Sequence, residues 1–195
     1  GLDDLYEFKP EEKIIEYKLK DKSKKKLADM TVSDFSDETA SESVAPGGGS
    51  VSAYMGSLGA ALGTMVANIS SHKRGWDDRW EEFSNWAEKG IALQSELTGL
   101  VDEDTEAFNK IMDAIKLPNK TAEEKRKRSQ ALQEATKNAI LVPYRIMEKS
   151  YNALEIIETM VEKGNPNSIT DAGVGALVVR SAVKGAFLNV QINAK

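Results

Sequence analysis

Hydrophobic residues recur at steps of three and four through most of the chain after Met30, which is the repeat of an amphipathic helix. Turn-forming residues divide this pattern into five segments. Pro143 is expected to interrupt or kink the fourth segment, and Gly164 to end it. The predicted helices cover residues 31–41, 50–71, 77–115, 121–163 and 168–193. We therefore expect an all-α fold, a bundle of about five packed antiparallel helices.

Residues that cap helices mark three of these starts. Ser50 follows the stretch APGGG and can cap the second helix with its hydroxyl group. Thr121 with Glu124, and Ser168 with Asp171, have the spacing of a capping box, in which each side chain bonds the backbone of the other residue. The fourth and fifth helices are therefore expected to begin with reciprocal caps.

The first 29 residues form a short non-helical tail that differs from the rest. Residues 14–19 alternate like a strand, and residues 18–26 are rich in lysine. A solvated linker explains the lysines, and contact with nucleic acid or a membrane is the alternative. The net charge is −5, so the chain has no overall positive field to attract nucleic acid. Cysteine is absent, which excludes disulfides and thiolate metal sites. We predict no nucleic-acid partner and no metal.

The apolar segment 51–69 approaches the length of a membrane span. Its glycines, alanines and serines make it only mildly hydrophobic, and it lacks flanking aromatic anchors. We expect it to be the central helix of a soluble bundle, approached closely on several sides, with no membrane partner. The chain does not open with a signal-peptide pattern.

One carboxylate lies where a hydrophobic side chain is expected. Asp104 falls on the apolar stripe of the third helix, while Asp102 and Thr105 fall on its polar side. Burial would raise the pKa of the Asp104 carboxyl, as a general acid–base near neutral pH requires. A structural carboxylate bonded to a neighbouring helix is an equal alternative. The stripe consists of Leu97, Leu100, Val101, Phe108, Ile111, Met112 and Ile115.

A glycine-rich loop forms a candidate anion site at the start of the second helix. It contains Gly47, Gly48, Gly49 and Ser50, and backbone N–H groups at the positive end of a helix can bind an anion. The loop lacks the lysine of a P-loop. A flexible turn between helices is the alternative.

Lys73 and Arg74 follow the second helix and are candidates to hold acidic groups of a ligand. Their charges also suit the negative end of the helix dipole, which is the simpler interpretation.

Polar residues gather near the end of the chain. Asn165, Asp171, Asn189 and Asn193 lie among small and apolar neighbours, and the last two share a helix face. Amide groups of this kind could bind the hydrogen-bonding edge of a heteroaromatic ring. The alternative gives Asn165 and Asp171 only helix-end roles.

The motifs together resemble the cyclodeaminase domain of the bifunctional formiminotransferase/cyclodeaminase family. The resemblance begins near Met30 and implies that residues 30–195 are the helical domain, truncated at its C-terminal end. It implies that residues 1–29 are the end of a formiminotransferase domain of the same longer chain. The matching stretches are APGGGSVSA, GAALGTMVAN, LVDEDTEAF, KLPNKTAEEKRKR, VPY, GNPNSITDA and FLNVQIN.

The resemblance implies cyclisation of 5-formimino-tetrahydrofolate to 5,10-methenyl-tetrahydrofolate with release of ammonia, a step of histidine degradation. Its catalytic carboxylate corresponds to Asp104. Ring closure within one molecule needs fixed geometry and proton transfer, so no cofactor is expected. The implied enzyme is cytoplasmic and at least a homodimer. Gly59 and Gly63, with Ala60 and Ala67, are candidates for close association of subunits, and a buried central position within one subunit explains them equally well. A methenyl-tetrahydrofolate cyclohydrolase and a non-catalytic helical dimerisation module are the alternatives.

Overall fold

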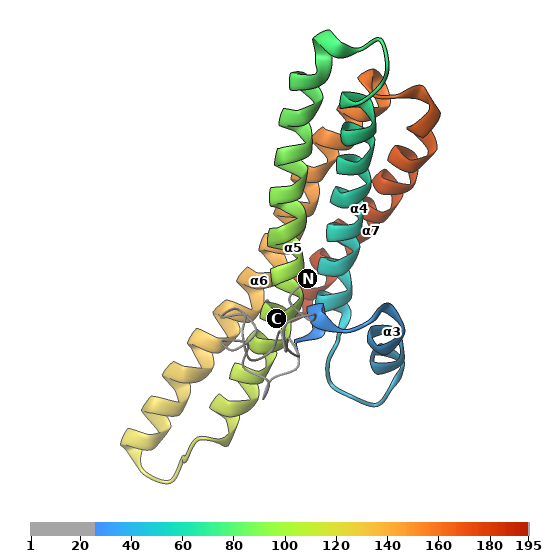
Figure 1. Cartoon of the computed structure of the whole chain (residues 1–195). Helices are drawn as coiled ribbons and strands as arrows, with labels where there is room; N and C mark the ends of the chain where they lie inside the picture. Colours follow the sequence, from blue (N-terminus) through green and yellow to red (C-terminus); the bar gives the residue numbers. More distant parts are fainter. Residues whose placement is uncertain (1–25, 195) are drawn as a thin grey trace, which may run out of the picture.

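The computed structural model describes residues 26–194, and within them all regular structure is helical (Figure 1). These residues contain five α-helices, which confirms the predicted all-α bundle. The strand predicted over residues 14–19 lies outside the described residues. The helices are α3 (Val32–Ala40), α4 (Gly48–Ser71), α5 (Trp80–Lys116), α6 (Ala122–Lys163) and α7 (Ile169–Asn193), with single 3₁₀ turns at Leu27–Asp29, Asp77–Arg79 and Pro166–Ser168.

Helix α4 is the centre of the bundle, as its small residues predict. It packs against α5, α6 and α7. Its glycines allow the close approach: a Cβ added at Gly59 would overlap Val179 of α7, and one at Gly63 would lie 3.2 Å from Ile157 of α6. The neighbouring Ala60 is fully buried. The small residues of α4 are therefore occupied within one subunit, so their assignment to subunit association is wrong.

Two of the predicted helix starts need correction. The capping box of Thr121 and Glu124 is present as predicted. Ser168 precedes α7 but makes no side-chain cap. Ser50 lies inside α4, because Gly47 occupies the N-cap position. The Ser50 hydroxyl is therefore free of capping and bonds across to α5.

The longest helices continue past the rest of the bundle. α6 has 42 residues and runs without a break through Pro143, so the predicted interruption is wrong. The end of α5 and the start of α6 extend as a hairpin that α4 and α7 do not cover (Figure 1). Ile115, on the predicted apolar stripe, is consequently 44% exposed, whereas Leu97 and Val101 of the same stripe are buried.

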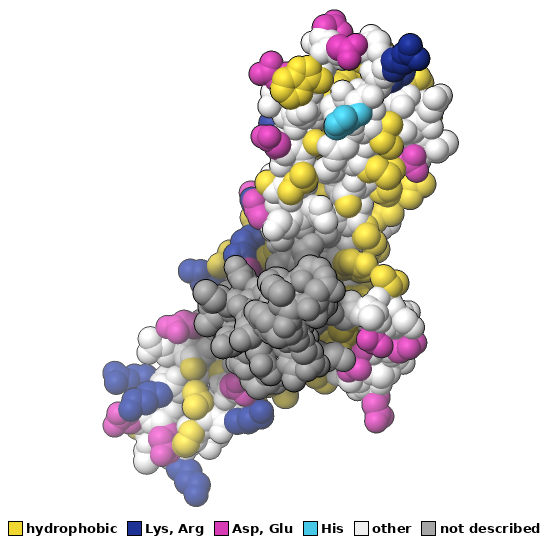
Figure 2. Space-filling view, viewed as in Figure 1, with side chains coloured by type: hydrophobic (Ala, Val, Ile, Leu, Met, Phe, Trp, Pro, Cys, Tyr) yellow, Lys and Arg dark blue, Asp and Glu magenta, His cyan; other side chains and the backbone are white. Residues whose placement is uncertain are grey.

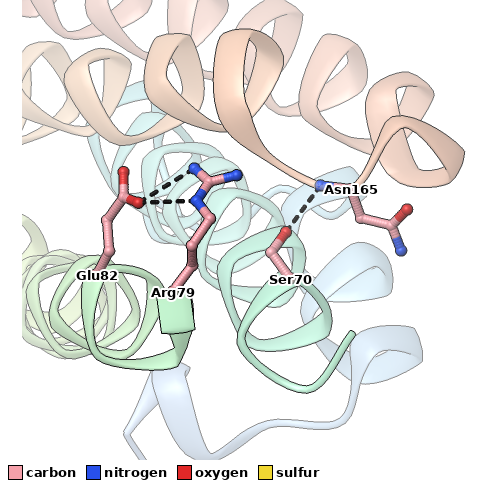
Figure 3. A network of polar contacts seen from close by, with 4 residues as sticks. All are labelled: Ser70, Arg79, Glu82 and Asn165. Atoms are coloured by element: carbon pink, nitrogen blue, oxygen red, sulfur yellow. Dashed lines mark hydrogen bonds and ion pairs between the residues drawn. The ribbon is translucent and has the colours of Figure 1, made fainter. Parts of the chain in front are cut away.

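Polar contacts fix the opposite end of the bundle, where α4 ends (Figure 3). The Ser70 hydroxyl accepts a hydrogen bond of 2.8 Å from the backbone N–H of Asn165, which ties the loop before α7 to α4. Arg79 pairs with Glu82 over 3.1 Å at the start of α5. At this end the bundle is therefore joined by a bond between a loop and a helix and by an ion pair within the start of α5.

The segment entering the bundle is held to α5 by Asp102. The Asp102 carboxylate accepts hydrogen bonds from the backbone N–H groups of Leu27 and Ala28, at 2.7 and 3.4 Å. Asp102 is thus a structural carboxylate, on a different side of α5 from Asp104.

Helix α7 is less covered than α4. The run Pro166–Asn193 is long and apolar enough to cross a membrane by length and composition alone, with a mean hydropathy of 1.3 and 22% of that window buried. The apolar segment of α4, which the sequence singles out, is instead mostly buried within the bundle. Hydrophobic side chains gather along the edge formed by α4 and α7 (Figure 2).

Two glycine substitutions test the close packing around α4. Gly59→Ala should lower the free energy of unfolding by about 1–3 kcal/mol, because the new methyl group would overlap Val179. Gly99→Ala is the matched control: Gly99 is exposed within α5 and a Cβ there meets nothing within 4 Å. It should raise that free energy by about 0.5–1 kcal/mol. Urea denaturation measures both, and equal effects would contradict the packing argument.

Candidate active site

A cavity of about 130 Å³ lies where the start of α4 meets α5, α6 and the end of α7. The turns at its rim come from distant parts of the sequence and are brought together by the antiparallel packing. Asp104 is the titratable side chain among its described lining residues. These are Val44, Ala45, Gly47, Gly48, Gly49, Asp104, Thr105, Ala107, Phe108, Ile111, Ala139, Asn189 and Asn193.

The carboxylate of Asp104 lies against the first turn of α4. The Ser50 hydroxyl donates to Asp104 Oδ2 over 3.1 Å, and the Ser50 backbone N–H also bonds the carboxylate. The positive end of the α4 dipole therefore faces an anion, as the glycine-rich loop predicts. That anion belongs to the protein itself: the helix start holds the side chain of Asp104.

Gly49 makes this contact possible. A Cβ added at Gly49 would lie 2.5 Å from Asp104 Cγ and would overlap Oδ1. At Gly47 the nearest such contact is 4.0 Å away, and at Gly48 it is Asn189 Nδ2 at 3.4 Å. Of the three glycines, Gly49 is thus the one whose missing side chain admits the carboxylate.

Opposing effects act on the protonation of Asp104. Burial raises the pKa of the carboxyl above its ordinary value, and the Ser50 hydroxyl and backbone N–H oppose this by bonding the charged form. Burial is the larger effect. The pKa of this carboxyl is therefore closer to neutral pH than that of a free aspartate, which favours both uptake and release of a proton.

Two amide side chains from the last turns of α7 complete the cavity. Asn189 Nδ2 donates to Gly185 O over 2.9 Å, and Asn193 Nδ2 donates to Ala139 O of α6 over 2.8 Å. Both amides are thereby fixed by main-chain carbonyls. Their predicted common helix face is confirmed, and it faces the cavity together with Asp104.

The structure does not bring the other four predicted residues to this cavity. Lys73 and Arg74 follow the far end of α4, a helix of 24 residues that spans about 36 Å. Lys73 lies over the ring of Trp76, 3.9 Å from its centroid. Asn165 bonds Ser70 at that same end (Figure 3), and Asp171 lies in the first turn of α7.

The chain is similar to a family of known proteins. A family model described as formiminotransferase-cyclodeaminase matches residues 31–195, which is most of the chain. The chain belongs to this family. The match includes the start of α4 and the turn of α5 that together hold Asp104.

Individual proteins, including one solved structure, are also similar to this chain. The formimidoyltransferase-cyclodeaminases of Mus musculus and Gallus gallus are 37% and 38% identical over all of this chain, which spans 36% of the length of each. A methenyltetrahydrofolate cyclohydrolase of Methylorubrum extorquens is 39% identical over 85% of this chain and 79% of its own. The crystal structure of formiminotetrahydrofolate cyclodeaminase from Thermotoga maritima superposes with a TM-score of 0.74 and 30% identity, covering 85% of this chain and 78% of that one.

One polar residue of this cavity is not predicted by the sequence. The spacing predicts Thr105 on the polar side of α5, yet it lines the cavity, with its Oγ1 3.2 Å from Ser50 Oγ. The periodicity of one helix gives no sign of this contact, because Ser50 is 55 residues away in the sequence.

The raised pKa of Asp104 predicts a pH-dependent effect on stability. The folded chain binds this proton more tightly than the unfolded chain. The stabilisation is therefore full below about pH 4, where an unfolded aspartate titrates, and is lost as the pH rises through the folded pKa. Asp104→Asn removes the titration. The free energy of unfolding of this variant, minus that of the wild type, should increase from about pH 4 to about pH 8 in urea denaturation. A constant difference would contradict the raised pKa.

Proposed function

We propose that this chain is the cyclodeaminase part of a longer formiminotransferase–cyclodeaminase and converts 5-formimino-tetrahydrofolate to 5,10-methenyl-tetrahydrofolate and ammonia. The observation that carries the proposal is a single carboxyl of raised pKa, fixed at the start of α4 and facing a cavity. The names of the relatives support the reaction class. The formiminotransferase part is proposed as a partner domain because the chain spans 36% of its mouse relative.

Asp104 is proposed to move one proton during this reaction. The formimino group on N5 enters the reaction protonated, as –CH=NH2+. N10 of the folate attacks its carbon, and Asp104 takes the proton that N10 loses. The bond between that carbon and its terminal nitrogen then breaks, and Asp104 returns the proton to the departing nitrogen, which leaves as ammonia. Both reacting atoms belong to one molecule, so the protein's task is orientation and proton transfer.

The size of the cavity limits what it can enclose. Pockets that bury a drug-sized ligand usually hold about 300–1,000 Å³, whereas this cavity holds about 130 Å³. The cavity therefore suits only part of a folate, its pterin ring with the reacting N5–N10 region, with the remainder of the molecule outside it. We assign the amides of Asn189 and Asn193 to the hydrogen-bonding edge of the pterin, since they line this cavity.

The site requires no cofactor in this proposal, since Asp104 supplies the proton transfer. Within residues 26–194, no group of three His, Asp or Glu side chains could hold a metal ion. A place in histidine degradation and a cytoplasmic location follow from the proposed reaction and stay predictions.

A cyclohydrolase activity is the second candidate, because a methenyltetrahydrofolate cyclohydrolase is 39% identical to this chain. The match to the mouse and chicken bifunctional enzymes extends over the whole chain, including the residues before Thr31 where the family model begins, and this favours the cyclodeaminase. Ammonia release from 5-formimino-tetrahydrofolate, compared with hydrolysis of 5,10-methenyl-tetrahydrofolate, distinguishes the two. A protein active only in the second assay would be a cyclohydrolase. Inactivity in both would leave the non-catalytic dimerisation module.

Replacing Asp104 tests the proton transfer directly. Asp104→Asn keeps the shape of the side chain but cannot exchange the proton, so kcat should fall by about 10²–10⁴ with KM little changed. Asp102→Asn is the matched control, because its amide oxygen still accepts the Leu27 N–H and it lies outside the cavity. Steady-state kinetics on folded variants provide the measurement. A folded Asp104→Asn variant with more than about a tenth of wild-type turnover would mean that Asp104 is structural.

We further propose that the chain forms a homo-oligomer, at least a dimer, through the edge of α4 and α7. The proposal no longer depends on the small residues of α4, since these are buried within the subunit. It depends on exposed hydrophobic residues along this edge, a surface typical of protein interfaces (Figure 2). They are Leu58, Met65, Ile69, Val174 and Leu177.

A charge introduced at this edge should separate the subunits. Leu177 is 63% exposed, so Leu177→Glu leaves the fold of one subunit intact and places a charge in the proposed interface. Tyr151→Glu on α6 is the matched control, since Tyr151 is 65% exposed. Light scattering should show a monomer for the first variant and an unchanged oligomer for the second. A monomeric wild type would refute the interface.

A further inference from the structure

The seam between α4 and α5 carries two pairs of hydroxyl side chains. Ser50 Oγ lies 3.2 Å from Thr105 Oγ1, and Ser57 Oγ lies 2.8 Å from Thr98 Oγ1. The members of the two pairs are seven residues apart on each helix, so the same contact repeats two turns along the seam. The pairs provide a natural comparison, because only the first of them meets a carboxylate.

The second pair is bonded to main chain. Thr98 Oγ1 donates to Gln94 O over 2.8 Å, and the Ser57 hydroxyl lies 3.3 Å from the same carbonyl oxygen. The carbonyl oxygen of Gln94 is therefore the main-chain acceptor for this pair, and the role of the pair is to join α4 to α5.

The first pair leads to Asp104. Ser50 is fully buried and its hydroxyl has one proton. An ionised carboxylate only accepts, so that proton is donated to Asp104 Oδ2 over 3.1 Å. The contact between Ser50 and Thr105 then has to be donated by Thr105. With Asp104 ionised, the order of donation is Thr105 to Ser50 to Asp104.

We infer that Thr105 is a positioning residue for Asp104: its hydroxyl donates to Ser50 and thereby commits the single Ser50 proton to the carboxylate. Donors in series polarise one another, so Thr105 strengthens the Ser50–Asp104 bond without touching Asp104. The inference rests on the proposed function for its role in catalysis. Its geometry is independent of that function.

Few other charges act on this chain of hydroxyl groups. Among the described residues that line the cavity from α4, α5, α6 and α7, the remaining polar side chains are Thr105, Asn189 and Asn193, and none of these titrates near neutral pH. A change in the titration of Asp104 can therefore be assigned to the hydroxyl groups that are removed.

The first experiment follows the titration of Asp104 itself, by the ¹³C chemical shift of its carboxyl carbon. Ser50→Ala removes a donor to the charged form, so the pKa of Asp104 should rise. Thr105→Val should raise it less, because the Ser50 donor remains, and Thr105→Ser should restore the wild-type titration. The double variant Ser50→Ala/Thr105→Val should titrate like Ser50→Ala alone, because Thr105 acts only through Ser50.

Thr98→Val is the matched control. It removes the same hydroxyl group from the equivalent contact two turns away, so it should change stability but leave the titration of Asp104 unaltered. A Thr105→Val effect that is undiminished in the Ser50→Ala background would mean that Thr105 acts on Asp104 or the substrate directly. Titrations of Ser50→Ala and Thr105→Val that match the wild type would also overturn the inference.

The second experiment measures kcat/KM against pH with 5-formimino-tetrahydrofolate. On the acid side of the profile, Ser50→Ala should lose about 10- to 100-fold, the range expected for a hydrogen bond to a charged group. Thr105→Val should lose less, and its acid limb should move to higher pH. Failure of the proposed function is a separate result, since an inactive wild type would leave the NMR titrations to decide the inference.

Discussion

The approach of Asp104 to the first turn of α4 is the contact on which the site depends. It requires a helix start with unpaired N–H groups, a residue without a side chain at position 49, and a hydroxyl group at position 50. These requirements explain Gly49 and Ser50, whereas substrate binding by Gly47 and Gly48 stays a prediction. They also place the carboxylate, since α4 packs along α5 and brings its first turn to the level of Asp104.

The energetics of this contact produce a group that can exchange protons. The start of α4 and the Ser50 hydroxyl favour the charged form, while burial favours the neutral form and is the stronger effect. A carboxylate held by donors alone would stay ionised, and one buried without donors would be costly to the fold. The combination raises the pKa of the carboxyl above that of a free aspartate while the position of the side chain stays fixed.

The sequence predicts those features that depend on neighbouring residues within one helix. Asp104 on the apolar stripe and the cap of Thr121 are of this kind, because helical spacing and capping chemistry are local. Lys73 and Asp171 are also charged residues of the kind that bind ligands, but whether they reach the cavity depends on which end of a helix packs against which neighbour. Thr105 was missed for the same reason, since its partner belongs to another helix. Local patterns thus identify the chemistry of a residue, and long-range packing decides which residues share a cavity.

Asp102 and Asp104 are two residues apart on α5, which places them on nearly opposite sides of that helix. Backbone N–H groups bond each carboxylate, those of Leu27 and Ala28 on one side and that of Ser50 on the other. This turn of α5 is therefore held from two directions, while among the described helices the hairpin beyond it packs against α6 (Figure 1). A displacement of the segment at Leu27 or a bend of the hairpin would therefore shift this turn of α5, and with it the wall of the cavity.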